Sequence, residues 1–211
     1  DVYKEAAELT PDNVSSRAYI AKIYLTRAQK AAHRGETGEQ QKWLDTVKTL
    51  LDELVAKDHK NVAVNNSLAL YWLAKGDLDQ SEAFVKEVLF EEPRDVTGLN
   101  TRGLINLKRN KFLVAEWIFK NKVLAEDPNS TEALTNLGFT YIQLDKRPLA
   151  MRYFKKALQQ DPGNMEVRMN IAAMLLEHLN YAEAQTHYAK VYNAQPLNME
   201  ALEGLCDATY A

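Results

Sequence analysis

The amino-acid sequence predicts an all-α fold in which pairs of helices repeat along the chain, and three observations predict it. Between Pro128 and Pro162, apolar residues fall at helical spacing in two stretches, separated by the polar break at 145–147. The same order of small and large residues returns about 34 positions later. Prolines recur at this interval, and a residue suited to capping a helix stands two positions after each of them. A regular succession of helical hairpins follows.

The composition is that of an ordinary globular protein. The chain has 211 residues, of which 46% are hydrophobic and 26% charged, with a formal net charge of -3. These values allow a continuous core and argue against a nucleic-acid-binding protein. The single cysteine, Cys206, excludes an intramolecular disulfide. No apolar run reaches the roughly 20 residues needed to cross a bilayer, so we expect no direct membrane span.

The pair of stretches between Pro128 and Pro162 shows the repeat most clearly. The first stretch has apolar or small residues at i, i+3, i+4 and i+7, namely Leu134, Leu137, Gly138 and Tyr141. The second has Ala150, Phe154 and Ala157 at i, i+4 and i+7. This order resembles the tetratricopeptide repeat, a helix–turn–helix unit that closes on a proline. The resemblance implies a right-handed α–α superhelix, a solenoid of about five repeats plus flanking half-repeats.

The ends of the helices are marked independently of the apolar pattern. The repeats end at Pro11, His59, Pro93, Pro128, Pro162 and Pro196, with the histidine in a slot that otherwise holds proline. The predicted caps are Asn13, Asn61, Asp95, Ser130, Asn164 and Asn198. Each of these side chains can accept a hydrogen bond from the first turn of the next helix, which stabilises it by about 1 kcal/mol.

The chain is expected to open with the end of a second helix over residues 1–10, because Tyr3, Ala6 and Pro11 match late positions of a repeat. A long repeat follows over 14–59. Its first helix runs from Val14 to about Ala32, residues 33–40 form a polar loop, and a second helix covers 41–58. The extra length is either a tolerated insertion, since longer loops cost little, or an added contact arm.

Four regular repeats follow, over 62–93, 96–128, 131–162 and 165–196, and an unpaired first helix covers 198–211. The third repeat has about one extra residue in its second helix and carries Arg102 where leucine is expected. A buried unpaired guanidinium is costly, so we expect Arg102 to reach solvent or an acid on a neighbouring helix. Cys206 falls at a small position, where a buried and inert thiol is expected. We also expect the array to continue beyond its ends, or another chain to cover them.

The resemblance implies that the first helices line a concave groove that binds a partner peptide or protein. The inward positions are Tyr19, Lys22, Asn66, Leu70, Asn100, Leu104, Lys108, Asn136, Phe139, Gln143, Met169, Asn170, Ala173 and Glu177, with Glu203 and Asp207 in the last helix. The asparagines either pair with the main chain of an extended peptide, because a primary amide both donates and accepts, or only solvate the groove. A clamp for a terminal carboxylate is not expected, since Asn66, Leu70, Thr97 and Thr101 supply no cation.

No catalytic constellation emerges from the sequence. Gly35 and Gly38 lie in a polar loop and do not form a phosphate-binding motif. The four histidines, His33, His59, His178 and His187, are scattered along the chain. His178 and His187 flank one turn, but two histidines without a third ligand make a poor metal site. We therefore expect no enzyme, no metal and no cofactor.

The predicted function is that of a non-catalytic scaffold for protein–protein interaction. Two alternatives remain open at this stage. The uncapped ends and the long first hairpin could mediate self-association or docking within a multi-protein machine, for example in a bacterial envelope. The chain could instead be the targeting arm of an enzyme whose catalytic domain lies elsewhere. The sequence leaves the compartment open between the cytoplasm and a periplasm-facing envelope.

Overall fold

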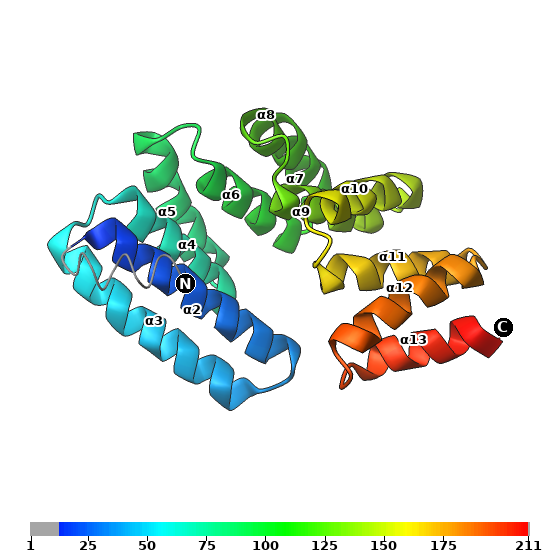
Figure 1. The fold of residues 1–211 in the computed structure, drawn as a ribbon. Coiled ribbons are helices and arrows are strands. Elements are labelled where there is room, and N and C mark those ends of the chain that lie inside the picture. The colour runs from blue at the N-terminus through cyan, green and yellow to red at the C-terminus, as the bar shows by residue number, and fades with distance from the viewer. Residues whose placement is uncertain (1–12, 211) are drawn as a thin grey trace. The chain divides into compact units, whose positions relative to one another are not determined.

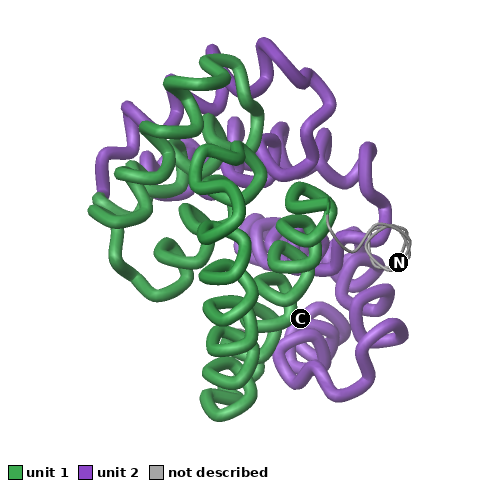
Figure 2. Tube along the Cα trace, turned by 90° about the vertical axis from the view of Figure 1, so that its left-hand side faces the viewer, with its two compact units in different colours: residues 1–109 green, residues 110–211 purple. Residues whose placement is uncertain are grey.

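A computed structural model describes residues 13–210, and every element in this range is a helix (Figure 1). The expected helix end over 1–10, with Tyr3, Ala6 and Pro11, lies outside the described residues. The chain divides into two compact units, residues 1–109 and 110–211, which Figure 2 distinguishes by colour. The boundary falls inside the third predicted repeat, between its first and second helices. Each unit is described by itself below.

In the described part of unit 1, two helical hairpins are followed by a single helix. Its elements are α2 (Val14–His33), α3 (Thr37–Lys57), α4 (Val62–Lys75), α5 (Leu78–Glu91) and α6 (Val96–Lys108). Helices α2 and α3 have 20 and 21 residues, whereas α4 and α5 have 14 each. The first hairpin is therefore extended, as the sequence predicts. It packs through a core of small residues on α2 against larger ones on α3, among them Ala18, Ala21, Leu44, Val47 and Leu51.

Unit 2 continues the succession of hairpins. Its elements are α7 (Phe112–Ile118), the π-helical segment η1 (Phe119–Val123), α8 (Leu124–Glu126), α9 (Thr131–Gln143), α10 (Arg147–Gln160), α11 (Met165–Glu177), α12 (Tyr181–Ala194) and α13 (Met199–Tyr210). The core of its first complete hairpin is the predicted one, because Leu134, Leu137, Tyr141, Ala150, Phe154 and Ala157 are all buried. Gly138 lies beneath the ring of Phe154, so the two helices approach closely there.

All six predicted caps are confirmed. The side-chain oxygens of Asn13, Asn61, Asp95, Ser130, Asn164 and Asn198 each accept a hydrogen bond from a backbone N–H two or three residues further on. Arg102 also behaves as expected. Its guanidinium lies 3.1 Å from the carboxylate of Glu82 on α5, and its side chain is 40% exposed. The charge is therefore paired and not buried alone.

The loop predicted over 33–40 is shorter in the structure, because α3 already begins at Thr37. The reversal of the chain is made by Gly35, whose φ of +72° is accessible to glycine with little strain. Gly38 lies in the first turn of α3, where a side chain would meet nothing within 4 Å. Glycine and polar residues made this stretch resemble a loop, although Glu39 in the first turn favours the start of a helix.

The expectation of a buried thiol at Cys206 is wrong, because this residue is exposed. Burial at its position requires the second helix of the same repeat, and α13 is the last element in the described part of the chain. Helix α13 instead buries Ala201, Gly204 and Ala208. Gly204 lies directly beneath the ring of Tyr188 on α12, at a distance that leaves no room for a Cβ atom. The side chain of Cys206 does not belong to this buried set.

Candidate functional site

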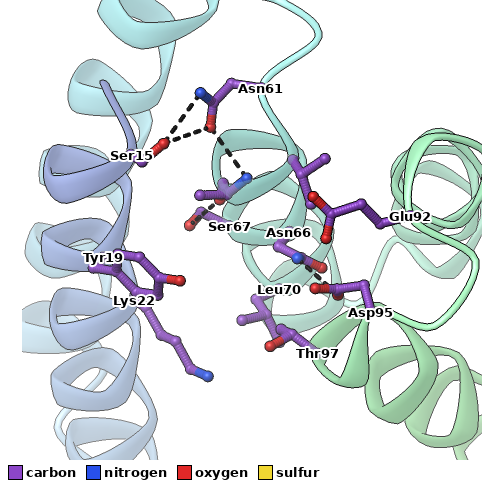
Figure 3. Close-up of a pocket in the computed structure, with 12 residues that line it drawn as sticks. Ser15, Tyr19, Lys22, Asn61, Asn66, Ser67, Leu70, Glu92, Asp95 and Thr97 are labelled. Atoms are coloured by element: carbon purple, nitrogen blue, oxygen red, sulfur yellow. Dashed lines mark hydrogen bonds between the residues drawn. The ribbon is translucent and has the colours of Figure 1, made fainter. Parts of the chain in front are cut away.

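A cavity of about 330 Å³ opens between the first helices of unit 1 (Figure 3). Helix α2 supplies Ser15, Tyr19 and Lys22 to its wall, and α4 supplies Asn66, Ser67 and Leu70. The third side comes from Glu92 and Asp95, which lie between α5 and α6, and from Thr97 in the first turn of α6. Three successive repeats thus contribute to one site, because the first helix of each repeat packs beside the first helix of the next.

Hydrogen bonds between the repeats hold this site together. The Oγ of Ser67 donates to the carbonyl oxygen of Ala18 at 3.0 Å, which joins α4 to α2. The Nδ2 of Asn61 donates to the Oγ of Ser15 at 3.2 Å while its Oδ1 caps α4. The wall of the cavity is thus fixed by side chains that also define the helix ends.

Asp95 and Asn66 form the centre of the polar wall. The Oδ1 of Asp95 accepts from the N–H of Gly98 at 2.6 Å, which caps α6, and also from the Nδ2 of Asn66 at 2.9 Å. A carboxylate only accepts hydrogen bonds, so the amide nitrogen of Asn66 has to face it. The Oδ1 of Asn66 is consequently held in one orientation. It is buried and has no hydrogen-bond partner.

The charges around the cavity are separated. The acceptors Asn66 Oδ1, Asp95 and Glu92 lie on the side of α4 and α6, whereas Lys22 extends from α2 on the other side (Figure 3). Leu70 supplies an apolar surface between them. This arrangement suits a ligand that has hydrogen-bond donors or a positive charge on one side and acceptors on the other.

The structure places the predicted groove residues in different environments. Tyr19, Lys22, Asn66 and Leu70 line the cavity. On α6 of the same unit, Asn100 is buried, Leu104 is half-buried and Lys108 is exposed. In unit 2, Asn136, Phe139, Met169, Asn170 and Ala173 are half-buried, while Gln143 and Glu177 are exposed. Peptide contact by the row of asparagines remains a prediction.

Two of these residues are engaged within their own hairpin or helix. The Nδ2 of Asn170 donates to the carbonyl oxygen of Glu166, one turn earlier, at 2.8 Å. The ring of Phe139 packs edge-on against Phe154 with 5.2 Å between centroids. Phe139 therefore contributes to the packing of α9 on α10.

Four residues of the site were not predicted from the sequence, namely Ser15, Asn61, Glu92 and Asp95. A signal was present, because Asn61 and Asp95 are caps, and a cap lies where one repeat meets the next. An extended cap side chain can reach a polar residue near the start of the preceding first helix, as Asp95 does with Asn66. The register of such pairs along the repeat could have indicated them.

The structure shows no arrangement of reactive side chains in this site. Among the described residues, no three of His, Cys, Asp or Glu come together in a way that could hold a metal ion. A search of the same residues for a helix long and apolar enough to cross a membrane found none. A cavity lined by a few polar side chains that can orient a ligand is typical of a binding site.

Stacked helical hairpins with caps at a constant register define a helical repeat protein, a class whose units contact mainly their neighbours. The family model of the tetratricopeptide repeat matches residues 131–164, which form α9, α10 and the turn that follows. These residues are a tetratricopeptide repeat, and the chain has the fold of tetratricopeptide-repeat solenoids. The protein is thus a helical repeat protein with this fold.

Several known proteins are similar to this chain. The anaphase-promoting complex subunit CDC16 of Saccharomyces cerevisiae is 26% identical over 140 residues, which cover 64% of this chain and 17% of that protein. A thermophilic tetratricopeptide-repeat protein of Thermus thermophilus has a TM-score of 0.68 at 17% identity, over 90% of this chain and 100% of that one. The anaphase-promoting complex hetero-tetramer Cut9–Hcn1 gives a TM-score of 0.71 at 15% identity, over 98% and 38% of the two chains. The structural likenesses concern the fold alone.

Proposed function

We propose that the protein is a non-catalytic interaction scaffold, and that the cavity of unit 1 binds an extended segment of a partner protein by one of its basic side chains. The observation that carries this proposal is the buried Oδ1 of Asn66, which has no partner and is held in place by Asp95. An unsatisfied buried acceptor costs about 1–3 kcal/mol. A ligand donor that displaces the atoms covering this oxygen recovers that free energy.

The chemistry of the cavity selects the kind of donor. A lysine or arginine side chain brings several N–H groups and a positive charge, and both Glu92 and Asp95 border the cavity beside Asn66. Lys22 on the opposite side is suited to a carbonyl oxygen or a carboxylate of the same segment. Leu70 covers the aliphatic part of the basic side chain, which prefers apolar contact.

The test uses a peptide array in which each short random sequence appears with lysine, arginine, alanine or glutamate at its centre. The probe is the full chain, compared with a Glu92→Gln plus Asp95→Asn variant. Asparagine caps helices as well as aspartate does, so this variant keeps the end of α6 and removes only the charges. We expect the lysine and arginine peptides to bind, and the variant to bind them about tenfold more weakly.

Two controls separate the cavity from the rest of the surface. Gln159→Ala changes an exposed amide on α10 and should leave peptide binding unaltered. Asn66→Leu removes the orphan oxygen and should abolish the preference for basic peptides while circular dichroism still shows a helical fold. Equal binding of the glutamate peptides, or unchanged binding by the Glu92→Gln plus Asp95→Asn variant, would contradict the proposal.

A second candidate function is that of a subunit which docks within a larger assembly. The similarity to CDC16 and to Cut9 favours it, because both belong to the anaphase-promoting complex. Self-association is the simplest form of such docking. Light scattering over a concentration series tests it, and a constant monomer mass at high concentration would exclude self-association.

A further inference from the structure

The second helix of the third repeat presents an unusual surface on its exposed side. Leu113, Val114 and Trp117 of α7 are 66%, 46% and 53% exposed, and Lys120, Asn121 and Lys122 of η1 follow them on the surface. We call these six residues the Trp117 face. The opposite side of the same helix is buried and carries Ala115, Ile118, Phe119 and Val123, and it packs against α9.

Three other second helices, α5, α10 and α12, serve as internal references for this surface. Their small residues Ser81, Ala150 and Ala184 correspond to Ala115, because each begins the buried side of its helix. At the position that corresponds to Trp117, α5, α10 and α12 carry Ala83, Arg152 and Thr186, respectively. At the position that corresponds to Leu113, they carry Asp79, Pro148 and Ala182. All six are exposed. Among these four helices, only α7 has large apolar residues at these positions, so the repeat does not require them.

The π-helical segment adds to the difference. In α10 the buried residues Phe154 and Ala157 are three apart, whereas Phe119 and Val123 are four apart. A π-turn absorbs the extra residue and keeps Val123 fully buried. Three exposed residues, Lys120 to Lys122, consequently lie between Phe119 and Val123, whereas two lie between Phe154 and Ala157 in α10. Single π-turns of this kind are frequent at functional sites because they re-aim side chains.

The positive charges of the Trp117 face lie next to its aromatic ring. The ammonium group of Lys122 lies 5.1 Å from the ring centroid of Trp117. The Nδ2 of Asn121 donates to the carbonyl oxygen of Trp117 at 3.1 Å, where the hydrogen-bonding ladder of the helix changes register. Glu116, the acid nearest in sequence, accepts from Tyr141 and lies 3.7 Å from Lys146, away from this face. The face is thus apolar along α7 and cationic along η1.

We propose that the Trp117 face binds an acidic amphipathic helix of a partner protein. Leu113 and Trp117 are four residues apart and form a ridge of the kind that fits between apolar residues at i, i+3 and i+4 of a second helix. Carboxylates beside those residues complement Lys120 and Lys122. This surface shares no residue with the cavity of unit 1, so different variants can test the two interactions.

The experiment is a selection from a displayed library of random helical peptides on the full chain. Binders that also recognise a Leu113→Ser plus Trp117→Ser variant are removed. We expect the remaining peptides to be acidic, with apolar residues three or four positions apart. Their affinity should fall at least about tenfold in that variant, because buried aromatic anchors dominate such interfaces. It should fall about threefold in Lys120→Gln plus Lys122→Gln, with a weaker dependence on salt.

Matched controls decide what a loss of binding means. Phe90 on α5 is 81% exposed, so Phe90→Ser removes an exposed ring elsewhere and should leave binding unchanged. Circular dichroism should show the same helical signal for every variant. Recovery of basic or uncharged peptides, or of none that distinguishes the variant, would overturn the proposal. So would dimerisation, or sedimentation with phosphatidylglycerol vesicles, that depends on Trp117.

Discussion

Gly138 shows how one residue sets the distance between two helices. A Cβ atom at this position would lie 2.3 Å from the ring of Phe154, which is fully buried. The ring cannot move away without disturbing the hairpin. A close approach also occurs at the end of the described chain, where Gly204 of α13 lies beneath Tyr188 of the preceding helix α12. The small residue at position 138 is therefore a steric requirement of its hairpin.

The replacement Gly138→Ala should consequently destabilise the protein. Alanine favours a helix by about 1 kcal/mol over glycine, but overpacking of a filled core typically costs about 1–3 kcal/mol. We expect a net loss in the free energy of unfolding, measured by urea titration. Gly38→Ala is the matched control, since its Cβ would meet nothing within 4 Å. That variant should be neutral or slightly stabilised, and an equal loss in both variants would refute the steric argument.

The protonation of His187 on α12 makes the stability of the folded protein depend on pH. Its burial lowers the pKa of the ring below the ordinary value of 6.5, and the positive charge of Arg168 lowers it further. Its Nδ1 is buried without a hydrogen-bond partner. Protonation of the folded protein would therefore place an unpaired N–H beside a cation.

The pKa shift predicts a loss of stability in acid. The pKa in the folded protein lies below that of the unfolded chain, so the unfolded chain binds more protons as the pH falls below 6.5. The free energy of unfolding should decrease over that range, in addition to the general effect of carboxylate protonation. His187→Gln should reduce the decrease, whereas replacement of the exposed His178 by glutamine should not. Urea titrations on either side of pH 6.5 measure the difference.

At the scale of the helix, local signals in the sequence predicted most features but not the start of α3. The sequence predicted the caps and the apolar spacing of α9 and α10, because these depend on residues within one or two helical turns. It also predicted that Arg102 pairs with an acid, which depends on a neighbouring helix. The start of α3 was missed because Gly35 and Gly38 are alike in the sequence, although only Gly35 has a positive φ.

The candidate site could be predicted only in part. Four of its residues followed from the family resemblance, but its polar centre depends on Asp95 reaching Asn66, which lies 29 positions away in the sequence. The exposure of Cys206 likewise depends on whether another helix follows. Contacts between helices of different repeats, or with the next helix, determine these features. The spacing of residues within one repeat therefore does not predict them.

Deletion of one residue from the π-helical segment η1 tests whether this segment contributes to the stability of the fold. Deletion of Asn121 would restore the spacing of three between the buried residues, as in Phe154 and Ala157, and would leave the number of residues from Val123 to the closing proline unchanged. We expect the variant to fold, with the same helical signal in circular dichroism and a free energy of unfolding within about 1 kcal/mol of the parent, because π-turns are less regular than α-helix. Unfolding of the variant would show that the segment is needed for packing.

At the scale of the whole molecule, the contacts divide the chain between α6 and α7. The two helices of the third repeat thus belong to different units. In a repeat protein, stability is approximately a sum of terms within repeats and between neighbours, so a chain need not unfold in a single step. A substitution in one unit should then lower mainly the stability of that unit.

The tryptophans allow this to be measured, since Trp43 and Trp72 lie in unit 1 and Trp117 lies in unit 2. A Trp117→Phe chain reports on unit 1, and a Trp43→Phe plus Trp72→Phe chain reports on unit 2. We expect Gly138→Ala to lower the urea midpoint seen by Trp117 and to leave that seen by Trp43 and Trp72 nearly unchanged. Equal shifts in both would mean that the boundary at residue 110 does not interrupt cooperativity. The free energy that couples the neighbouring repeats would then exceed the stability of either unit alone.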